Sequence, residues 1–228
     1  MSKLLISCKN ISEVSKIKNL VDIIDLKNPD IGSLGAWKIE EILNVTKQKK
    51  YMPLISATLG NFKNIDLIIN RLKKFDKLGL DYIKFGIFSS DQKEIDLLIK
   101  RVVKEEIRTR VVAVLFADTK LNIEKIKFNL IKFKKLKINH VMLDTQKKNN
   151  QGLLQIYNED FLKDLVEIAR LNNINIGFAG QLKEKDLAKL INFNPYLCGI
   201  RTAACFEMKR KNEISKTNVE KMRTLFNC

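Results

Sequence analysis

Short runs of β-branched and aromatic residues alternate with longer stretches of helical periodicity along the whole chain. In the longer stretches apolar residues recur three and four positions apart, as at Phe161, Leu165 and Ile168, which predicts amphipathic helices. The short runs predict eight strands, at Leu4–Cys8, Val21–Lys27, Leu54–Thr58, Tyr82–Ile87, Arg110–Ala117, His140–Asp144, Ile174–Ala179 and Cys198–Thr202.

Eight strand–helix units at nearly even spacing indicate parallel pairing and an α/β fold. Eight such units close into a barrel, so we predict a single-domain (β/α)8 TIM barrel over residues 1–228. A doubly wound open sheet is the alternative. That fold favours a G-x-G-x-x-G turn after the first strand, whereas residues 8–12 read C-K-N-I-S.

The composition shows that the chain is strongly basic. Hydrophobic residues make up 45% of the chain, enough for a core, and the net charge is +16. Such a charge can mark a nucleic-acid-binding surface. The basic clusters Arg71–Lys77, Lys132–Lys137 and Lys209–Lys211 lie in different segments, however, and the aromatic-glycine motif of RNA-binding sheets is absent. We therefore expect no specific nucleic-acid partner, and a positive field that favours anionic substrates.

Cysteine and histidine usage argues against metal chemistry. The four cysteines form no C-x-x-C pair, and the single histidine, His140, lies at the start of a predicted strand. We expect no metal, no other cofactor, and free thiols in a reducing, cytoplasmic setting. No apolar run approaches the ~18 residues of a membrane span. The segment Met1–Ser7 is too short and too quickly polar for a signal peptide.

Polar residues inside apolar strands are the informative positions, because reactive groups of such barrels collect at the carboxyl ends of strands. Asp25 and Lys27 lie two apart in the second strand and should both point into the barrel, while Ile24 and Leu26 face the helices. A charged pair in this place is costly unless it is partnered or used.

Lys84 in the fourth strand and Asp144 at the end of the sixth extend this set. Burial and a neighbouring cation lower the pKa of a lysine, and a neutral amine can attack a carbonyl to form a Schiff base. A nearby carboxylate can move protons. This favours class I aldolase-like chemistry on Lys27 or Lys84. The alternative is that Lys27–Asp25 and Lys84–Asp144 are structural ion pairs.

The ends of the last two strands predict a phosphate site. Gly180 follows the seventh predicted strand, Arg201 and Thr202 end the eighth, and Ala203 comes directly after it. Small residues and free backbone N–H groups at this edge of a barrel suit a phosphate. Arg201 could add a bidentate contact, or it could lie inside the barrel in an ion pair.

Together these segments resemble the (5-formylfuran-3-yl)methyl phosphate synthase family of methanofuran biosynthesis. The resemblance covers nearly the whole chain. The matching segments are Asp22–Pro29, Gly32–Ala36, Ser56–Thr58 with Gly60, Asp81–Lys84 with Gly86, Ala117–Asp118, Met142–Thr145, Ala179–Gly180, and Arg201 with Ala203–Cys205.

The resemblance implies a lyase that converts two molecules of glyceraldehyde 3-phosphate to a furan aldehyde phosphate, with loss of phosphate and water. It assigns Lys27 as the Schiff-base lysine, Lys84 as a partner acid–base, and Asp25 and Asp144 as supporting carboxylates. It adds Lys148, four residues past Asp144, as a further active-site lysine.

For binding, the resemblance and the strand ends together give a second set of residues. Substrate or phosphate contacts are expected at Ser56, Asp118, Gly180, Arg201, Thr202 and Ala203. The expected partners are small phosphorylated trioses, without a membrane, and assembly into a homo-oligomer is left open.

Several loop residues depart from the family pattern. Asn61 replaces an acidic residue, Thr202 replaces a glycine, and Phe206–Arg210 replaces a glycine-rich stretch. Because these loops would hold phosphate, two alternatives stay open. One is a related Schiff-base aldolase or lyase acting on another phosphorylated aldehyde, and the other is a non-enzymatic, basic nucleic-acid-binding barrel.

Overall fold

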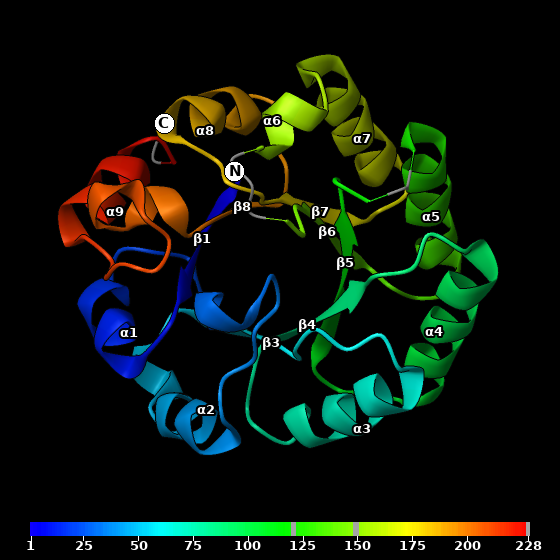
Figure 1. Ribbon diagram of the computed structural model, residues 1–228, viewed down its shortest axis with the longest axis horizontal. Coiled ribbons are helices and arrows are strands. Elements are labelled where there is room, and N and C mark those ends of the chain that lie inside the picture. The colour runs from blue at the N-terminus through cyan, green and yellow to red at the C-terminus, as the bar shows by residue number, and fades with distance from the viewer. Residues whose placement is uncertain (120–121, 148–150, 227–228) are drawn as a thin grey trace.

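The computed structural model is a closed barrel of eight parallel strands inside a ring of helices (Figure 1). It describes residues 1–119, 122–147 and 151–226. The strands pair in chain order, and β8 closes the barrel on β1, with Leu5 opposite Gly199. The predicted single-domain (β/α)8 barrel is therefore confirmed.

The elements lie close to their predicted ranges. The strands are β1 (Lys3–Cys8), β2 (Ile23–Leu26), β3 (Leu54–Thr58), β4 (Tyr82–Ile87), β5 (Arg110–Phe116), β6 (His140–Asp144), β7 (Asn175–Phe178) and β8 (Leu197–Ile200). The α-helices are α1 (Ile11–Ile17), α2 (Ile39–Thr46), α3 (Ile65–Phe75), α4 (Gln92–Lys104), α5 (Ile123–Lys135), α6 (Leu153–Ile156), α7 (Glu159–Leu171), α8 (Glu184–Ile191) and α9 (Lys216–Thr224). Short 3₁₀ turns are η1 (Pro29–Ile31), η2 (Lys49–Tyr51), η3 (Thr202–Ala204) and η4 (Phe206–Met208).

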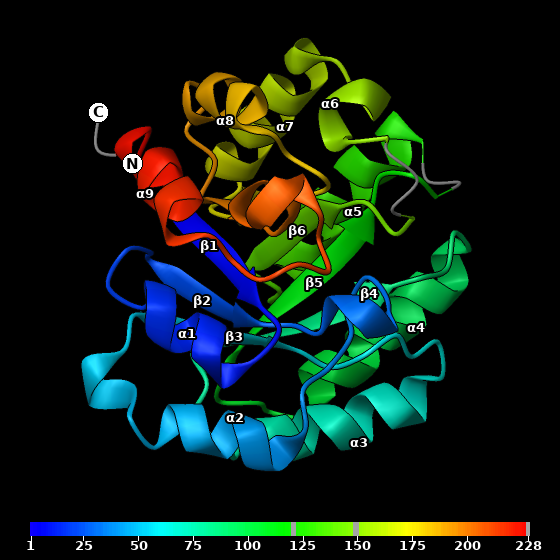
Figure 2. The ribbon, with the colours of Figure 1, turned by 60° about the vertical axis from the view of Figure 1, so that its left-hand side comes forward.

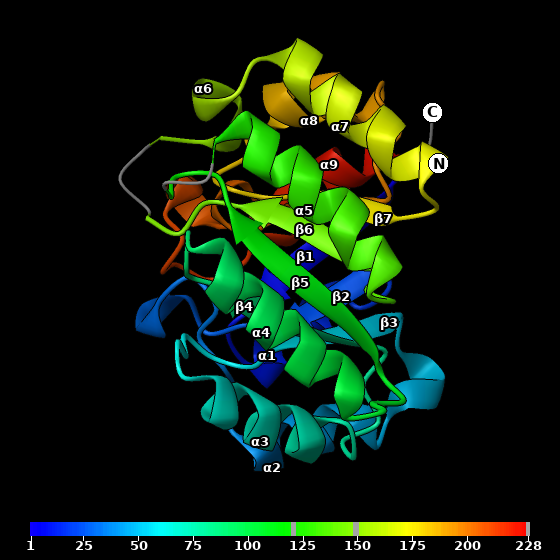
Figure 3. The ribbon, with the colours of Figure 1, turned by 90° about the vertical axis from the view of Figure 1, so that its right-hand side faces the viewer.

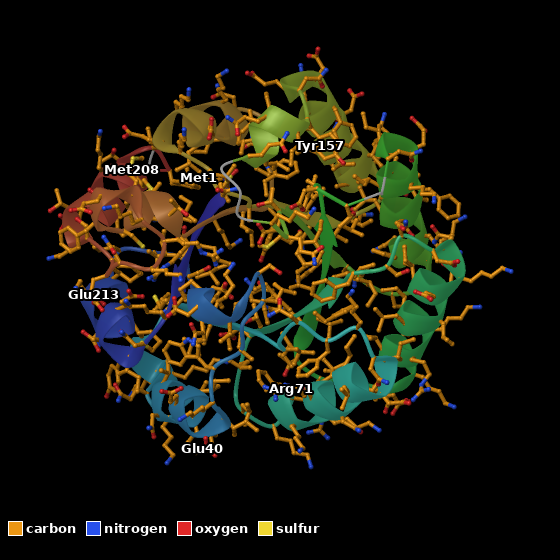
Figure 4. The ribbon with its side chains drawn as sticks, viewed as in Figure 1. Met1, Glu40, Arg71, Tyr157, Met208 and Glu213 are labelled. Atoms are coloured by element: carbon orange, nitrogen blue, oxygen red, sulfur yellow. The ribbon has the colours of Figure 1, made fainter. Side chains whose placement is uncertain are left out.

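The alternation of strand side chains produces two buried layers. Ile24 and Leu26, as expected, join the large core between strands and helices, whereas Ile23, Val114 and Met142 lie inside the barrel. Side chains occupy the middle of the ring, so the barrel is packed rather than an open pore (Figure 4). Within the described residues, no helix combines the length and the apolar character needed to span a bilayer.

The loops that follow the strands gather at one end of the barrel. Figures 2 and 3 show η1 and the segment after β8 at this carboxyl end, while the N-terminus lies at the other. The three basic clusters lie on α3, at the end of α5 and in the segment after β8, on separate sides of the ring (Figure 1). The positive charge is therefore spread around the barrel and does not form a single basic face.

The loop after β2 folds over the carboxyl end and is fixed by Asn61. The Asn61 amide donates to the carbonyl of Ile31 at 2.6 Å and accepts from the backbone N–H of Leu34 at 3.0 Å. Leu34 in turn packs inside the barrel. An acidic residue at position 61 could accept a hydrogen bond from the Leu34 N–H but could not donate one to the Ile31 carbonyl. Asn61 therefore gives the loop one more hydrogen bond than an acidic residue would.

Candidate active site

Asp25 is the centre of a polar network inside the first four strands. It is fully buried, and its carboxylate accepts hydrogen bonds from Ser7 of β1 at 2.9 Å and from Ser56 of β3 at 2.8 Å. The third partner is Lys84 of β4, with Nζ 2.6 Å from Asp25 Oδ2. Four neighbouring strands thus converge on one carboxylate, which compensates for its burial.

Lys84 is held deep in the barrel by this contact. Its side chain is only 2% exposed. Burial lowers the pKa of Lys84, and the positive charge of Lys27 lowers it further, while Asp25 acts in the opposite direction. The amine therefore loses its proton more readily than an exposed lysine, a property that suits a group that passes protons.

Lys27 lies at the mouth of the barrel, just past the end of β2. Its Nζ lies 3.8 Å from Asp144 Oδ2, an ion pair without hydrogen-bond distance. The ion pairs considered from the sequence, Lys27–Asp25 and Lys84–Asp144, are therefore wrong. The observed pairs are Lys84–Asp25 and Lys27–Asp144. We call Ser7, Asp25, Lys27, Ser56, Lys84 and Asp144 the carboxyl-end network.

A pocket opens above this network, at the mouth of the barrel. Glycines 180 and 199 leave space on the side of β7 and β8. The polar side chains that line the pocket include Lys27, Lys84, Asp144, Gln181, Thr202 and Arg210.

The residues predicted to bind substrate divide into two groups. Gly180 and Thr202 line the pocket, and Arg201 reaches its wall. Ser56 instead hydrogen-bonds Asp25, and Ala203 is buried and does not line the pocket.

Asp118 does not line the pocket. Its carboxylate accepts hydrogen bonds from the backbone N–H groups of Gln146 and Lys147, both at 2.6 Å, and so fixes the start of the loop after β6. Its position past β5 made it look like a ligand contact, but its oxygens are occupied by this loop.

Arg201 lies in an ion pair, which is the second of the two arrangements that the sequence left open. Its guanidinium forms a two-point ion pair with Glu13 of α1, which is fully buried. The remaining donors go to the carbonyls of Ser7 at 3.1 Å, Arg210 at 2.9 Å and Asn212 at 2.8 Å. All five N–H groups are thus engaged, which leaves Arg201 no donor for a phosphate.

Glu13 and Arg210 were not singled out from the sequence. Glu13 is a charged residue in the first turn of an amphipathic helix, a place where charge is usual. Arg210 is one of several cations in a basic loop. Lys148, the further lysine implied by the family resemblance, lies outside the described residues.

The opposite end of the barrel interior holds a second, small cavity, which Lys84 also lines. We call Tyr82, Arg110, His140 and Tyr196 the amino-end cluster. The hydroxyls of Tyr82 and Tyr196 lie 2.7 Å apart, and the His140 ring stacks at a tilt against both, with centroids at 5.3 and 5.7 Å. Burial lowers the pKa of His140 to about 4, so this ring is neutral at physiological pH.

The three cysteines among the described residues are buried and are not paired with one another. Cys8, Cys198 and Cys205 are free, and burial raises the pKa of Cys198 to about 12 and that of Cys205 to about 11. Thiolates are therefore scarce at neutral pH. Within the described ranges no group of three or more His, Cys, Asp or Glu side chains is placed to hold a metal ion.

Comparisons with known proteins identify the family and the fold. The family model described as 4-HFC-P synthase matches residues 4–223. The (5-formylfuran-3-yl)methyl phosphate synthases of Methanococcus aeolicus and Methanosarcina mazei are each 32% identical to this chain, over 96% of it and 97% of their own length. A crystal structure of a 3-hexulose-6-phosphate synthase shares the fold, with a TM-score of 0.69, 18% identity, and coverage of 98% of this chain and 99% of its own.

Proposed function

The chain belongs to the 4-HFC-P synthase family, and we propose that it forms (5-formylfuran-3-yl)methyl phosphate from two molecules of glyceraldehyde 3-phosphate through a Schiff base on Lys27. The reaction releases one phosphate and two waters, which balances the atoms. It is a carbon–oxygen lyase reaction that includes an aldol-type step. The free, buried thiols fit the reducing cytoplasm that we propose as its setting.

The observation that carries this proposal is the contrast between the two lysines. Lys27 is at the pocket mouth, with its amine in a loose ion pair to Asp144. Lys84 is locked against Asp25 at 2.6 Å in the interior. An amine that must leave its partner to attack a carbonyl suits Lys27, and an amine held in place next to a carboxylate suits proton transfer.

The proposed steps follow from this placement. The Lys27 amine adds to the aldehyde carbon of one triose phosphate, and loss of water gives an imine. Lys84 accepts the proton from the neighbouring carbon, and the resulting enamine expels phosphate from the third carbon, which leaves an enol with a nucleophilic terminal carbon. This carbon attacks carbon 2 of the second triose phosphate after that triose has isomerised to its ketone form. The carbon-1 hydroxyl of the second triose then closes the ring on carbon 2 of the first, loss of two waters yields the furan, and hydrolysis of the imine consumes one water and frees Lys27. Asp144, with one oxygen held by the Thr145 N–H at 2.7 Å, stabilises the cationic imine.

Borohydride trapping tests this proposal. With glyceraldehyde 3-phosphate, peptide mass mapping should locate the reduced adduct on Lys27 in the wild-type protein. The Lys27→Arg variant keeps a cation near Asp144 but cannot form an imine, so it should lose both the adduct and product formation. An adduct on Lys84, or activity retained in Lys27→Arg, would overturn the assignment.

The altered phosphate-side loops favour one second candidate, a related lyase acting on a different phosphorylated aldehyde. Thr202 and Phe206–Arg210 are the residues concerned. Trapping at Lys27 without phosphate release and without a new ultraviolet-absorbing furan would indicate that activity. An absent adduct together with salt-sensitive RNA binding would indicate the non-enzymatic alternative.

A further inference from the structure

The charges that line the pocket are matched one by one, with a single exception. Lys84 pairs with Asp25, Lys27 pairs with Asp144, and Arg201 pairs with Glu13. The Arg210 guanidinium also lines the pocket, yet among residues 1–119, 122–147 and 151–226 it has neither a hydrogen bond nor an ion pair. Among the described residues, Arg210 is therefore the cation of the pocket wall without a direct carboxylate partner, and Asp144 and Asp30 act on it only at longer range.

The position of Arg210 is fixed through its backbone. Its carbonyl accepts a hydrogen bond from Arg201 Nε at 2.9 Å and a longer one from Cys205 Sγ at 3.9 Å. Arg201 is itself held to α1 by Glu13. The Arg201 side chain thus fixes the backbone of Arg210 near the end of β8. The Arg210 guanidinium takes no part in these contacts.

A free guanidinium in a half-buried wall is unfavourable until an anion reaches it. Burial lowers the pKa of Arg210, Asp144 and Asp30 act in the opposite direction, and the neighbouring charge of Arg201 lowers the pKa further. Gly180, Gln181 and Thr202 line the same pocket, and Gly180 has a positive φ of 108°, a conformation that favours glycine. The planar fork of a guanidinium matches two oxygens of a phosphate.

We propose that Arg210 binds the phosphate of the substrate that reacts at Lys27, the contact that sequence reasoning gave to Arg201. This inference rests on the proposed function for the identity of the substrate. The prediction that Arg210 binds an anion is independent of the proposed function, because a guanidinium without an ion-pair partner favours any phosphate that enters the pocket. Arg201 is then a positioning residue, and Arg210 is the one that distinguishes phosphorylated from unphosphorylated aldehydes.

Binding of inorganic phosphate, followed by calorimetry on the full chain, tests the anion contact. Loss of a charge-assisted, two-point contact in Arg210→Gln should weaken binding roughly 10- to 100-fold. Arg210→Lys should lie between this variant and the wild type. The matched control is Lys209→Gln, which removes the same charge one position away from an exposed ion pair with Glu207. Equal weakening in the control, or none in Arg210→Gln, would overturn the proposal.

Trapping kinetics test the choice of substrate. The ratio of borohydride trapping rates with glyceraldehyde 3-phosphate and with glyceraldehyde should fall at least about tenfold in Arg210→Gln, and a general loss of activity cancels in this ratio. An unchanged ratio would refute the role of Arg210. If the wild-type protein forms no adduct with either aldehyde, the proposed function fails, and phosphate binding alone then decides whether Arg210 is an anion site.

Discussion

The two ends of the barrel interior use polar side chains in opposite ways. At the carboxyl end, two lysines and two aspartates are paired across strands and stand beside the pocket. At the amino end, Tyr82, His140 and Tyr196 are neutral rings packed on one another. Buried charge is costly in free energy, and here it is concentrated at the end where strands deliver their side chains to the loops.

The comparison indicates a division of labour within one closed sheet. The amino-end cluster fills the barrel and seals it with hydrogen-bonded rings, so its loss should affect stability and leave the chemistry alone. The carboxyl-end network should affect both, because each of its charges is a partner of another. Leu5, Lys84 and Met142 line the cavities at both ends, and Lys84 is the charged residue among them that could blur this division.

The largest effect is expected from Asp25→Ala, which leaves the Lys84 amine buried without a carboxylate. Breaking a buried ion pair from one side costs about 3–5 kcal/mol. Loss of a group that supports proton transfer should lower kcat at least ~100-fold. Denaturant unfolding and steady-state kinetics measure the two effects.

Asp22→Ala is the matched control for this change. Asp22 precedes β2 at the amino end, where it pairs with Arg223 at 2.6 Å and is partly exposed. It should cost about 1 kcal/mol or less and leave kcat unchanged. If Asp22→Ala lowered kcat as much as Asp25→Ala, the two ends would not be functionally distinct.

A smaller effect is expected from pH at the amino end. The pKa of His140 is about 4 in the folded protein and 6.5 in a model peptide, so the unfolded chain binds the proton first as pH falls. Stability from the neutral ring is complete above pH 6.5 and is lost as pH falls towards 4, by up to about 3 kcal/mol. Unfolding free energies of the wild type and of His140→Gln, compared from pH 7 to 4, should diverge in this window. Parallel curves would show that His140 titrates normally.

The smallest effect is expected from Tyr82→Phe. The change removes the hydroxyl that meets Tyr196 at 2.7 Å and accepts from Arg110 at 3.2 Å, which should cost about 1 kcal/mol in unfolding free energy. The rate of adduct formation at Lys27 should stay within about twofold, because ring packing is retained. A tenfold loss of rate would show that the amino-end cluster reaches the pocket through Lys84.

Much of the fold could be predicted because barrel strands follow a period of two. The β-branched runs located the strands, and alternation placed Asp25 inside the barrel with Ile24 and Leu26 outside. The convergence of Lys27 and Asp144 followed from their places at or near the ends of two strands. These features could be predicted because the side of the strand that a residue faces, and its distance from the end of the strand, depend only on the neighbouring sequence.

The pairing of lysines with carboxylates could not be predicted in the same way. Which carboxylate meets which lysine depends on the stagger of β2 against β4 and on the reach of a lysine side chain, and neither is visible in one strand. Asp118 follows the strand-end rule but is used by the backbone of the next loop. The exchange of roles between Arg201 and Arg210 depended on Glu13, which lies 188 positions before Arg201 in the chain.

The ion pair between Glu13 and Arg201 affects when the chain can fold during synthesis. Glu13 emerges from the ribosome early, yet its guanidinium partner and the backbone N–H of Ile214 come almost last. Until then a carboxylate that will be fully buried must stay hydrated, and the edge of β1 has no β8 to cover it. Contacts of such long sequence separation slow folding. The nascent chain therefore closes its barrel, and completes the pocket wall, only after nearly all of it has been translated.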